Sequence, residues 1–194
     1  MARLRMIEVG KFGEKVIRSF FEYCGFYVDR LKDSHTAGSL MSGNLGDFVV
    51  SGLNSAFYLE VKTTELDNIN KGILKIGQMR KQLVALKYGT PGVYAFVMKS
   101  HNRVLIYRWE DVFVWHKIRS IKNINKHSYN NININYTLSK NYIVFKDKWK
   151  ELKLELIKFI MQPSEFINQA TNITFSVPRK KYSKLNPKIL KRED

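Results

Sequence analysis

The alternation of apolar and polar residues predicts an ordered series of helices and strands over residues 1–111. Residues 8–24 carry apolar side chains three and four positions apart, which is typical of a helix with one buried face. Residues 76–88 show the same spacing and predict a second helix. Between and after these helices lie runs of β-branched and aromatic residues that predict strands. These runs are residues 26–31, 47–50, 57–63, 93–99 and 104–108. The predicted order is helix, three strands, helix and two strands, in one mixed α/β unit.

The pattern after residue 111 is weaker. Residues 123–135 are rich in Asn, which predicts a loop or a weak hairpin. Five apolar residues further on lie at helical spacing and predict a helix that ends at Pro163. They are Phe145, Trp149, Leu152, Leu156 and Phe159. We therefore expect an α/β core followed by a basic C-terminal extension that contains at least one helix.

The charge of the chain changes the picture from a fold to a partner. The 194 residues include 33 Lys and Arg against 17 Asp and Glu, for a net charge of +16. Nucleic acid is the leading candidate for a polyanionic partner, and an anionic membrane surface is the second. Residues 1–111 carry +5, residues 112–178 carry +6, and residues 179–194 carry +5 in a short tail. We take these three segments as a core, an extension and a basic, flexible tail.

Composition also excludes several classes of protein. The single cysteine, Cys24, rules out a disulfide framework and a cysteine zinc site. The N-terminal residues lack the apolar run of a signal peptide, and no apolar stretch approaches the ~20 residues of a membrane span. These features predict a soluble, cytoplasmic protein.

The candidate chemistry begins with a predicted hairpin. Residues 47–50 and 57–63 flank the turn-forming segment 51–56. If Val50 pairs with Phe57, the register of the two strands is fixed, and with it the face to which each side chain points.

In this register Asp47 lies opposite Glu60, and Glu60 shares its face of the strand with Lys62. The apolar residues point to the other face; they are Phe48, Val50, Phe57, Leu59 and Val61. Directly opposed residues have Cβ atoms only ~4.5–5.5 Å apart, and two carboxylates that close repel each other unless a cation lies between them. The set predicts a Mg²⁺ site, in which Mn²⁺ can substitute, and phosphodiester hydrolysis is the chemistry that needs it.

These residues resemble the signature of the PD-(D/E)XK nuclease superfamily. Gly46 and Asp47 stand where the family has Pro-Asp, and Glu60-Val61-Lys62 matches its Glu-X-Lys. The resemblance implies a restriction-endonuclease-like fold with an α-β-β-β-α-β core and a mixed sheet. It implies that Asp47 and Glu60 bind the metal and that Lys62 assists the attacking water.

The resemblance also assigns roles on the two helices. Glu14 fits the glutamate that many members carry on the first helix, where it would complete or support the metal site, and Glu8 is the alternative. Gln78 fits a glutamine near the start of the second core helix, with an ordinary helix-surface residue as the alternative.

Within the superfamily, residues 8–111 look most like Holliday-junction resolvases of the archaeal Hjc and bacterial RecU kinds. This implies a DNA endonuclease of recombination or repair that acts on branched DNA as a homodimer. The alternatives are a restriction or homing endonuclease that cuts duplex DNA at a fixed sequence, or a non-catalytic DNA-binding protein on the same fold. Candidate phosphate contacts are Ser39 and Ser42, for which a flexible loop without such contacts is the alternative. Further candidates in the tail, for which a solubilising role is the alternative, are Arg179, Lys180, Lys181 and Lys184.

Overall fold

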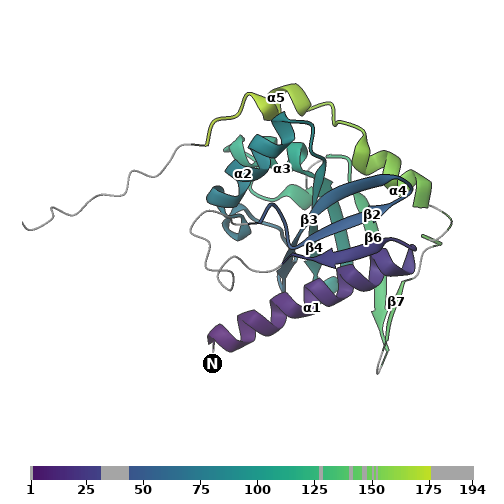
Figure 1. Cartoon of the computed structure of the whole chain (residues 1–194). Coiled ribbons are helices and arrows are strands. Elements are labelled where there is room, and N and C mark those ends of the chain that lie inside the picture. Colours follow the sequence, from purple (N-terminus) through teal and green to yellow (C-terminus); the bar gives the residue numbers. More distant parts are fainter. Residues whose placement is uncertain are drawn as a thin grey trace, which may run out of the picture.

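One curved sheet organises the described part of the chain (Figure 1). The computed structural model describes residues 2–31, 44–126, 129–139, 142–145, 148–149, 151 and 153–175. Within these ranges, seven strands lie in sequence order from β1 to β7. They are β1 (Tyr27–Arg30), β2 (Phe48–Gly52), β3 (Ser55–Thr64), β4 (Gly92–Met98), β5 (Arg103–Arg108), β6 (Ile132–Leu138) and β7 (Ile143–Phe145). The β3–β4 pair is parallel and the other pairs are antiparallel, so the expected mixed α/β sheet is confirmed.

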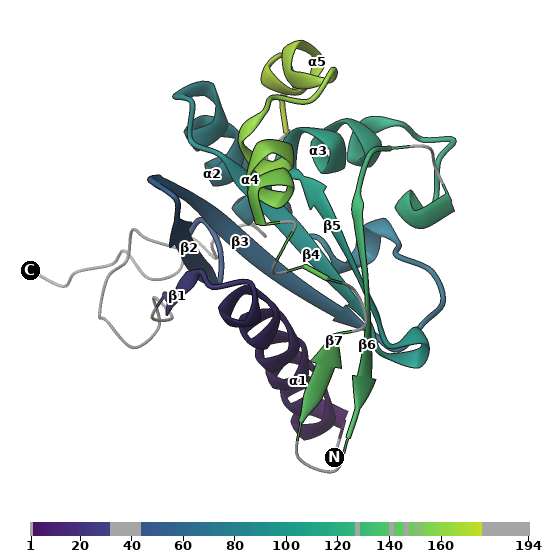
Figure 2. The same ribbon diagram turned by 90° about the vertical axis from the view of Figure 1, so that its right-hand side faces the viewer.

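Helices cover both faces of the sheet (Figure 2). On one face α1 (Ala2–Tyr23) and α4 (Lys153–Met161) pack against a core that includes side chains of every strand. On the other face α2 (Ile76–Lys87), α3 (Trp109–Lys117) and α5 (Ile167–Thr171) enclose a second core with aromatic residues of β4 and β5. Three short 3₁₀ helices lie in the connections: η2 (Lys71–Ile73), η3 (Lys99–His101) and η4 (Ile124–Lys126). No helix in the described ranges is long and apolar enough to cross a bilayer.

The β2–β3 hairpin has the register that the sequence predicts. Val50 pairs with Phe57 and Phe48 with Leu59. The turn itself consists of Leu53 and Asn54, which both have positive φ, as a two-residue type I′ turn requires. The order helix, three strands, helix, two strands is likewise confirmed, although α1 begins at Ala2 rather than at residue 8.

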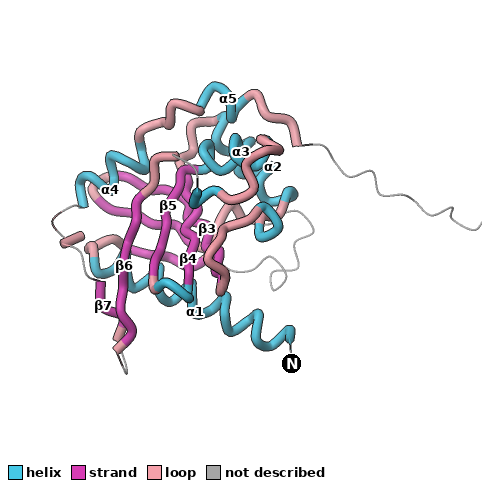
Figure 3. The backbone as a smooth tube through the Cα atoms, turned by 180° about the vertical axis from the view of Figure 1, so that it is seen from behind, coloured by secondary structure: helices cyan, strands magenta, loops and turns pink. Residues whose placement is uncertain are grey.

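The interpretation of residues 123–135 as a loop or weak hairpin is wrong for their second half. Residues from Ile132 onward form β6, which pairs with β5 and extends the sheet (Figure 3). Ile132, Ile134 and Tyr136 are buried, whereas Asn133 and Asn135 between them face solvent. The Asn residues therefore occupy the polar face of a half-buried strand, and the period of two in the apolar residues is the signal that matters.

The predicted helix through Phe145 and Trp149 is also wrong at its N-terminal end. Phe145 ends β7, and α4 begins only at Lys153. Phe145 nevertheless packs in the same core as Leu156, and its ring meets the Phe20 ring edge-on. Residues that share a core can therefore fall at helical spacing although a strand contributes one of them.

A missing side chain lets α1 lie close to β3. A Cβ atom added to Gly13 would lie 1.8 Å from Oγ1 of Thr63, far inside contact distance. The same addition at Gly10, one turn earlier on the same helix, meets nothing within 4 Å. Gly13 is thus the point at which the helix crosses the strand, and Glu14 follows it directly.

We predict that Gly13→Ala destabilises the fold by about 1–3 kcal/mol, because the methyl group forces α1 away from β3. Gly10→Ala is the matched control and should stabilise the fold by up to ~1 kcal/mol, since alanine favours the helix. Urea unfolding of the three proteins measures both changes. Adding Thr63→Ala to Gly13→Ala should restore part of the loss, and equal stabilities for the two glycine variants would contradict the close approach.

Candidate active site

The candidate site lies where β3 runs past the start of β2. The β2–β3 ladder begins at Phe48 and Leu59, so residues 60–64 of β3 have no partner on β2. On its other side β3 stays paired with β4 as far as Thr64. One edge of β3 is therefore open beside Glu60, Val61 and Lys62, and we refer to this open edge with Asp47 as the notch.

The side chain of Asp47 occupies the open edge of β3. Its Oδ2 accepts a hydrogen bond of 2.7 Å from the backbone N–H of Val61, which has no β2 residue opposite it. Its own backbone N–H donates to the carbonyl of Leu59, and its carbonyl accepts from the N–H of Leu31, both at 2.9 Å. Three hydrogen bonds thus hold Asp47 between β1 and β3.

Gly46 makes this position sterically possible. A Cβ atom at residue 46 would lie 2.6 Å from the carbonyl oxygen of Leu59, which is backbone and cannot turn away. Glycine at this position, where the resembled family has proline, is therefore required by the close approach of the chain to β3.

Glu60, Lys62 and Gln78 form the second half of the site. The Glu60 side chain is only 2% exposed, and the Lys62 ammonium group forms an ion pair with its Oε1. The Gln78 amide, near the start of α2, donates to the other oxygen, Oε2, at 2.5 Å. Glu60 lies opposite Tyr94 of β4, so its carboxylate points toward the face that α2 covers.

Burial dominates the electrostatics of both carboxylates. It raises the pKa of Glu60 to about 7, against the opposing effect of Lys62 and with a further increase from the charge of Asp47. Burial also raises the pKa of Asp47, while the Val61 N–H and Lys62 lower it. The charge of Lys62 lowers the pKa of both carboxylates, so this one lysine interacts electrostatically with Asp47 and with Glu60.

Glu14 reaches the site from α1. It forms an ion pair with Arg30 of β1, with Nε of Arg30 at 2.9 Å from Oε2. The charges of Glu14 and Arg30 both act on the pKa of Asp47, in opposite directions. Glu8 lies six residues earlier on α1 and is exposed.

The donor set of the notch fits a hard divalent cation. Asp47 and Glu60 offer carboxylate oxygens, and Mg²⁺ in proteins is often held by one or two carboxylates together with water and phosphate oxygens. No three His, Cys, Asp or Glu side chains in the described residues lie close enough together to hold a metal ion. The remaining ligands of a cation at this site would therefore be backbone carbonyl, water or substrate oxygens.

Six candidate contacts to DNA lie outside the described residues. They are Ser39, Ser42, Arg179, Lys180, Lys181 and Lys184.

Sequence reasoning missed two residues that the structure brings to the site. Arg30 is the last residue of β1 and has an opposite charge to Glu14, and Gln82 is a polar residue on the apolar side of α2. The polar residue in an apolar stripe is a signal that the sequence carries.

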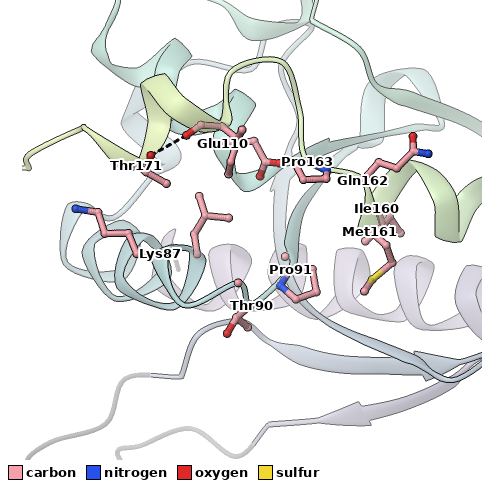
Figure 4. A pocket seen from close by; sticks show the side chains of 13 residues that line it. Lys87, Thr90, Pro91, Glu110, Ile160, Met161, Gln162, Pro163 and Thr171 are labelled. Atoms are coloured by element: carbon pink, nitrogen blue, oxygen red, sulfur yellow. Dashed lines mark hydrogen bonds between the residues drawn. The ribbon is translucent and has the colours of Figure 1, made fainter.

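A separate pocket of about 300 Å³ lies at the opposite end of α2 (Figure 4). It is bounded by the α2–β4 connection, the α4–α5 connection and the start of α3, and Glu110 lines it. One oxygen of Glu110 accepts a hydrogen bond of 3.0 Å from the N–H of Ser164. None of the candidate site residues lines this pocket.

Comparison with known proteins shows similarity to solved structures. No protein-family model matches the chain, and neither does any curated protein. Among solved structures, the chain is similar to Hjc of Archaeoglobus fulgidus, a Holliday junction resolvase from an archaeal hyperthermophile. The TM-score is 0.42 with 18% identity, and the match covers 59% of this chain and 84% of Hjc. A similarity of this extent does not identify a function for the chain.

We predict that burial of Glu60 makes the stability of the metal-free protein depend on pH. The folded-state pKa of about 7 lies above the ordinary value of 4.5, so the folded state binds the proton more tightly. This contribution to stability is complete below about pH 4.5 and is lost as the pH rises through about 7. Relative to Glu60→Gln, the wild type should therefore lose about 2–3 kcal/mol between about pH 5 and pH 8.

Urea unfolding in EDTA at several pH values measures this difference. Glu65→Gln changes an exposed carboxylate just after β3 and serves as the control, whose difference from the wild type should stay small at all pH values. A difference between Glu60→Gln and the wild type that does not vary with pH would show that Glu60 is not desolvated in the folded protein.

Proposed function

We propose that the protein is a metal-dependent DNA endonuclease that hydrolyses phosphodiester bonds. The observation that carries this proposal is the notch, in which Asp47 and the almost fully buried Glu60 meet one lysine, Lys62, in a chain with a net charge of +16. Two neighbouring carboxylates whose pKa values are both raised by burial are costly for the fold, and such sites are often functional.

Each residue of the notch has a role in this reaction. Asp47 and Glu60 would hold a Mg²⁺ or Mn²⁺ ion, which supplies Lewis-acid activation of water and neutralises phosphate charge. Lys62 lies against Glu60 and can donate to a water or to a phosphate oxygen beside that carboxylate, where it stabilises developing negative charge. Gln78 fixes the orientation of the Glu60 carboxylate from α2. Glu14, paired with Arg30, acts on Asp47 through its charge.

The charge of the chain supports DNA as the partner. Residues 112–194 hold most of the excess positive charge, whereas residues 1–111, which contain the notch, carry only +5. We propose that the core hydrolyses the phosphodiester bond and that the C-terminal part binds phosphates.

The finer proposal is a substrate with a four-way branch. It rests on the sequence resemblance of residues 8–111 to resolvases, through Gly13-Glu14, Glu60-Val61-Lys62 and Gln78. A four-way junction has two-fold symmetry, so the enzyme would act as a homodimer with one notch for each of two strands.

We predict that Mg²⁺ or Mn²⁺ supports DNA cleavage and that EDTA abolishes it. Glu60→Gln and Lys62→Met should each lower the rate by at least about 100-fold, because the first removes a proposed metal ligand and the second removes the positive charge beside the reacting phosphate. Lys87→Met, which changes an exposed lysine at the end of α2 opposite the notch, is the control and should cleave like the wild type. Gel assays with a labelled four-way junction, linear duplex and single strand measure the rates.

The same assay separates the candidate functions. Symmetric cuts confined to the junction support the resolvase, and one sequence-fixed cut in linear duplex supports a restriction or homing enzyme instead. Tight DNA binding without cleavage in any divalent cation would leave only a binding protein. Wild-type cleavage by Glu60→Gln would refute the assignment of the notch as the active site.

We predict that the basic tail contributes to DNA binding. Replacing Arg179, Lys180, Lys181 and Lys184 with glutamine should weaken binding and flatten its salt dependence. The slope of log K against log salt should become shallower by about 0.9 for each phosphate that the variant no longer neutralises. Fluorescence anisotropy at several salt concentrations measures the slope, and an unchanged slope would show that these residues do not touch phosphate.

A further inference from the structure

Gln82 is a buried polar residue at the centre of α2. Its side chain is 0% exposed, and it lies among Met79, Leu83 and Leu86 on the side of the helix that packs into the core. Its Nε2 donates a hydrogen bond of 2.7 Å to the carbonyl of Leu45, and its Oε1 accepts one from the hydroxyl of Tyr94. Both ends of the amide therefore have partners, as a buried amide requires.

The chemistry of these partners fixes the orientation of the amide. The carbonyl oxygen of Leu45 can only accept a hydrogen bond, so it must face the nitrogen of Gln82. The Tyr94 hydroxyl then donates to the oxygen, and burial strongly favours its protonated form by raising the pKa of this phenol. Gln82 is thus locked between β4 on one side and the segment before β2 on the other.

Only one residue, Gly46, separates Leu45 from Asp47, and the backbone of Gly46 has little freedom to move. The Gly46 backbone lies so close to the Leu59 carbonyl that no side chain fits between them, and the Asp47 N–H is bonded to the same carbonyl. A displacement of Leu45 would therefore be passed on to Asp47. The hydrogen bond from Gln82 is the described side-chain contact that holds the Leu45 carbonyl.

Helix α2 therefore contacts both segments that carry the carboxylates of the site, the one with Glu60 and the one with Asp47. Gln78 donates to the side chain of Glu60, and Gln82, one turn later on α2, donates to the main chain next to Asp47. Tyr94 connects the two contacts, because it binds Gln82 and lies directly opposite Glu60 on the neighbouring strand.

We propose that Gln82 is a positioning residue that sets the place of Asp47 relative to Glu60 by holding the carbonyl of Leu45. The inference rests on the proposed function, since it matters for a metal held between these carboxylates. Outer contacts of this kind orient metal ligands, and their loss typically weakens metal binding by roughly 10- to 100-fold.

The first test is hydrogen exchange of the metal-free protein, measured by NMR. Gln82→Met keeps the length of the side chain and removes both hydrogen bonds. Exchange of the Asp47 amide should become at least about fivefold faster relative to the amides of β4, which is the factor that a single net hydrogen bond is worth. Gln169→Met, at an exposed position on α5, is the matched control and should leave the ratio unchanged. A buried glutamine with a purely structural role would speed all of these amides together.

The second test is the affinity for Mn²⁺, followed by electron paramagnetic resonance of the free ion. Gln82→Met should bind Mn²⁺ roughly 10- to 100-fold more weakly than the wild type. Tyr94→Phe removes only the hydroxyl that orients Gln82 and keeps the ring in the core. It should shift the exchange ratio and the affinity in the same direction by a smaller factor, and it serves where Gln82→Met does not fold.

The outcomes distinguish this inference from the proposed function. Faster exchange confined to Asp47 together with weaker Mn²⁺ binding supports the positioning role. An Asp47 amide that changes only in step with β4, or unchanged Mn²⁺ affinity in the folded variants, overturns it. Equal Mn²⁺ binding by the wild type and Glu60→Gln refutes the metal site itself, and the role of Gln82 then fails with it.

Discussion

The unequal lengths of β2 and β3 are the constraint on which the candidate site depends. A strand that extends beyond its neighbour leaves backbone donors without partners, and buried donors of this kind are costly. In this protein a carboxylate satisfies one of them, because Oδ2 of Asp47 accepts from the N–H of Val61. The same hydrogen bond brings Asp47 beside Glu60 and Lys62. The contact that satisfies the backbone donor therefore also forms the cluster of these three charged side chains. The other edge of β3 leaves no such opening, since β4 pairs with β3 along residues 58–64.

The cluster is unfavourable for the fold by itself. Glu60 loses its hydration, and neither Lys62 nor Gln78 compensates enough to keep its pKa near the value in water. Replacing a buried, paired ionic group with an apolar one often stabilises a protein, so a contribution to stability does not account for the presence of Glu60. A divalent cation between Glu60 and Asp47 would reverse the balance, because it attracts both carboxylates. This is the physical reason for treating the notch as a site for chemistry rather than as part of the core.

Much of this arrangement can be predicted from the sequence, and the exceptions have a common cause. The register of the hairpin follows from alternation alone, because a slip of one residue would bury Glu60 and Lys62 on the wrong face. β6 is missed because Asn is a weak strand former, and its place on the exposed face depends on pairing with β5. The boundary of α4 is missed because Phe145 joins the same core from a strand. Arg30 and Gln82 are missed because their partners, Glu14 and Leu45, lie far away in sequence.

Two glycines show how the fold itself determines the geometry of the site. Gly13 lets α1 touch β3 at Thr63, and Gly46 lets the chain touch β3 at Leu59. Each glycine directly precedes an acidic residue, Glu14 and Asp47 respectively, so each acidic side chain begins at a point of closest approach to the same strand. The close approach at these two positions leaves little room for the backbone to move, so it restricts the places of the acidic groups together with their hydrogen bonds. The close approach at Gly46 and the hydrogen bond from Gln82 to the Leu45 carbonyl therefore act on the same short segment, and together they place Asp47 beside Glu60.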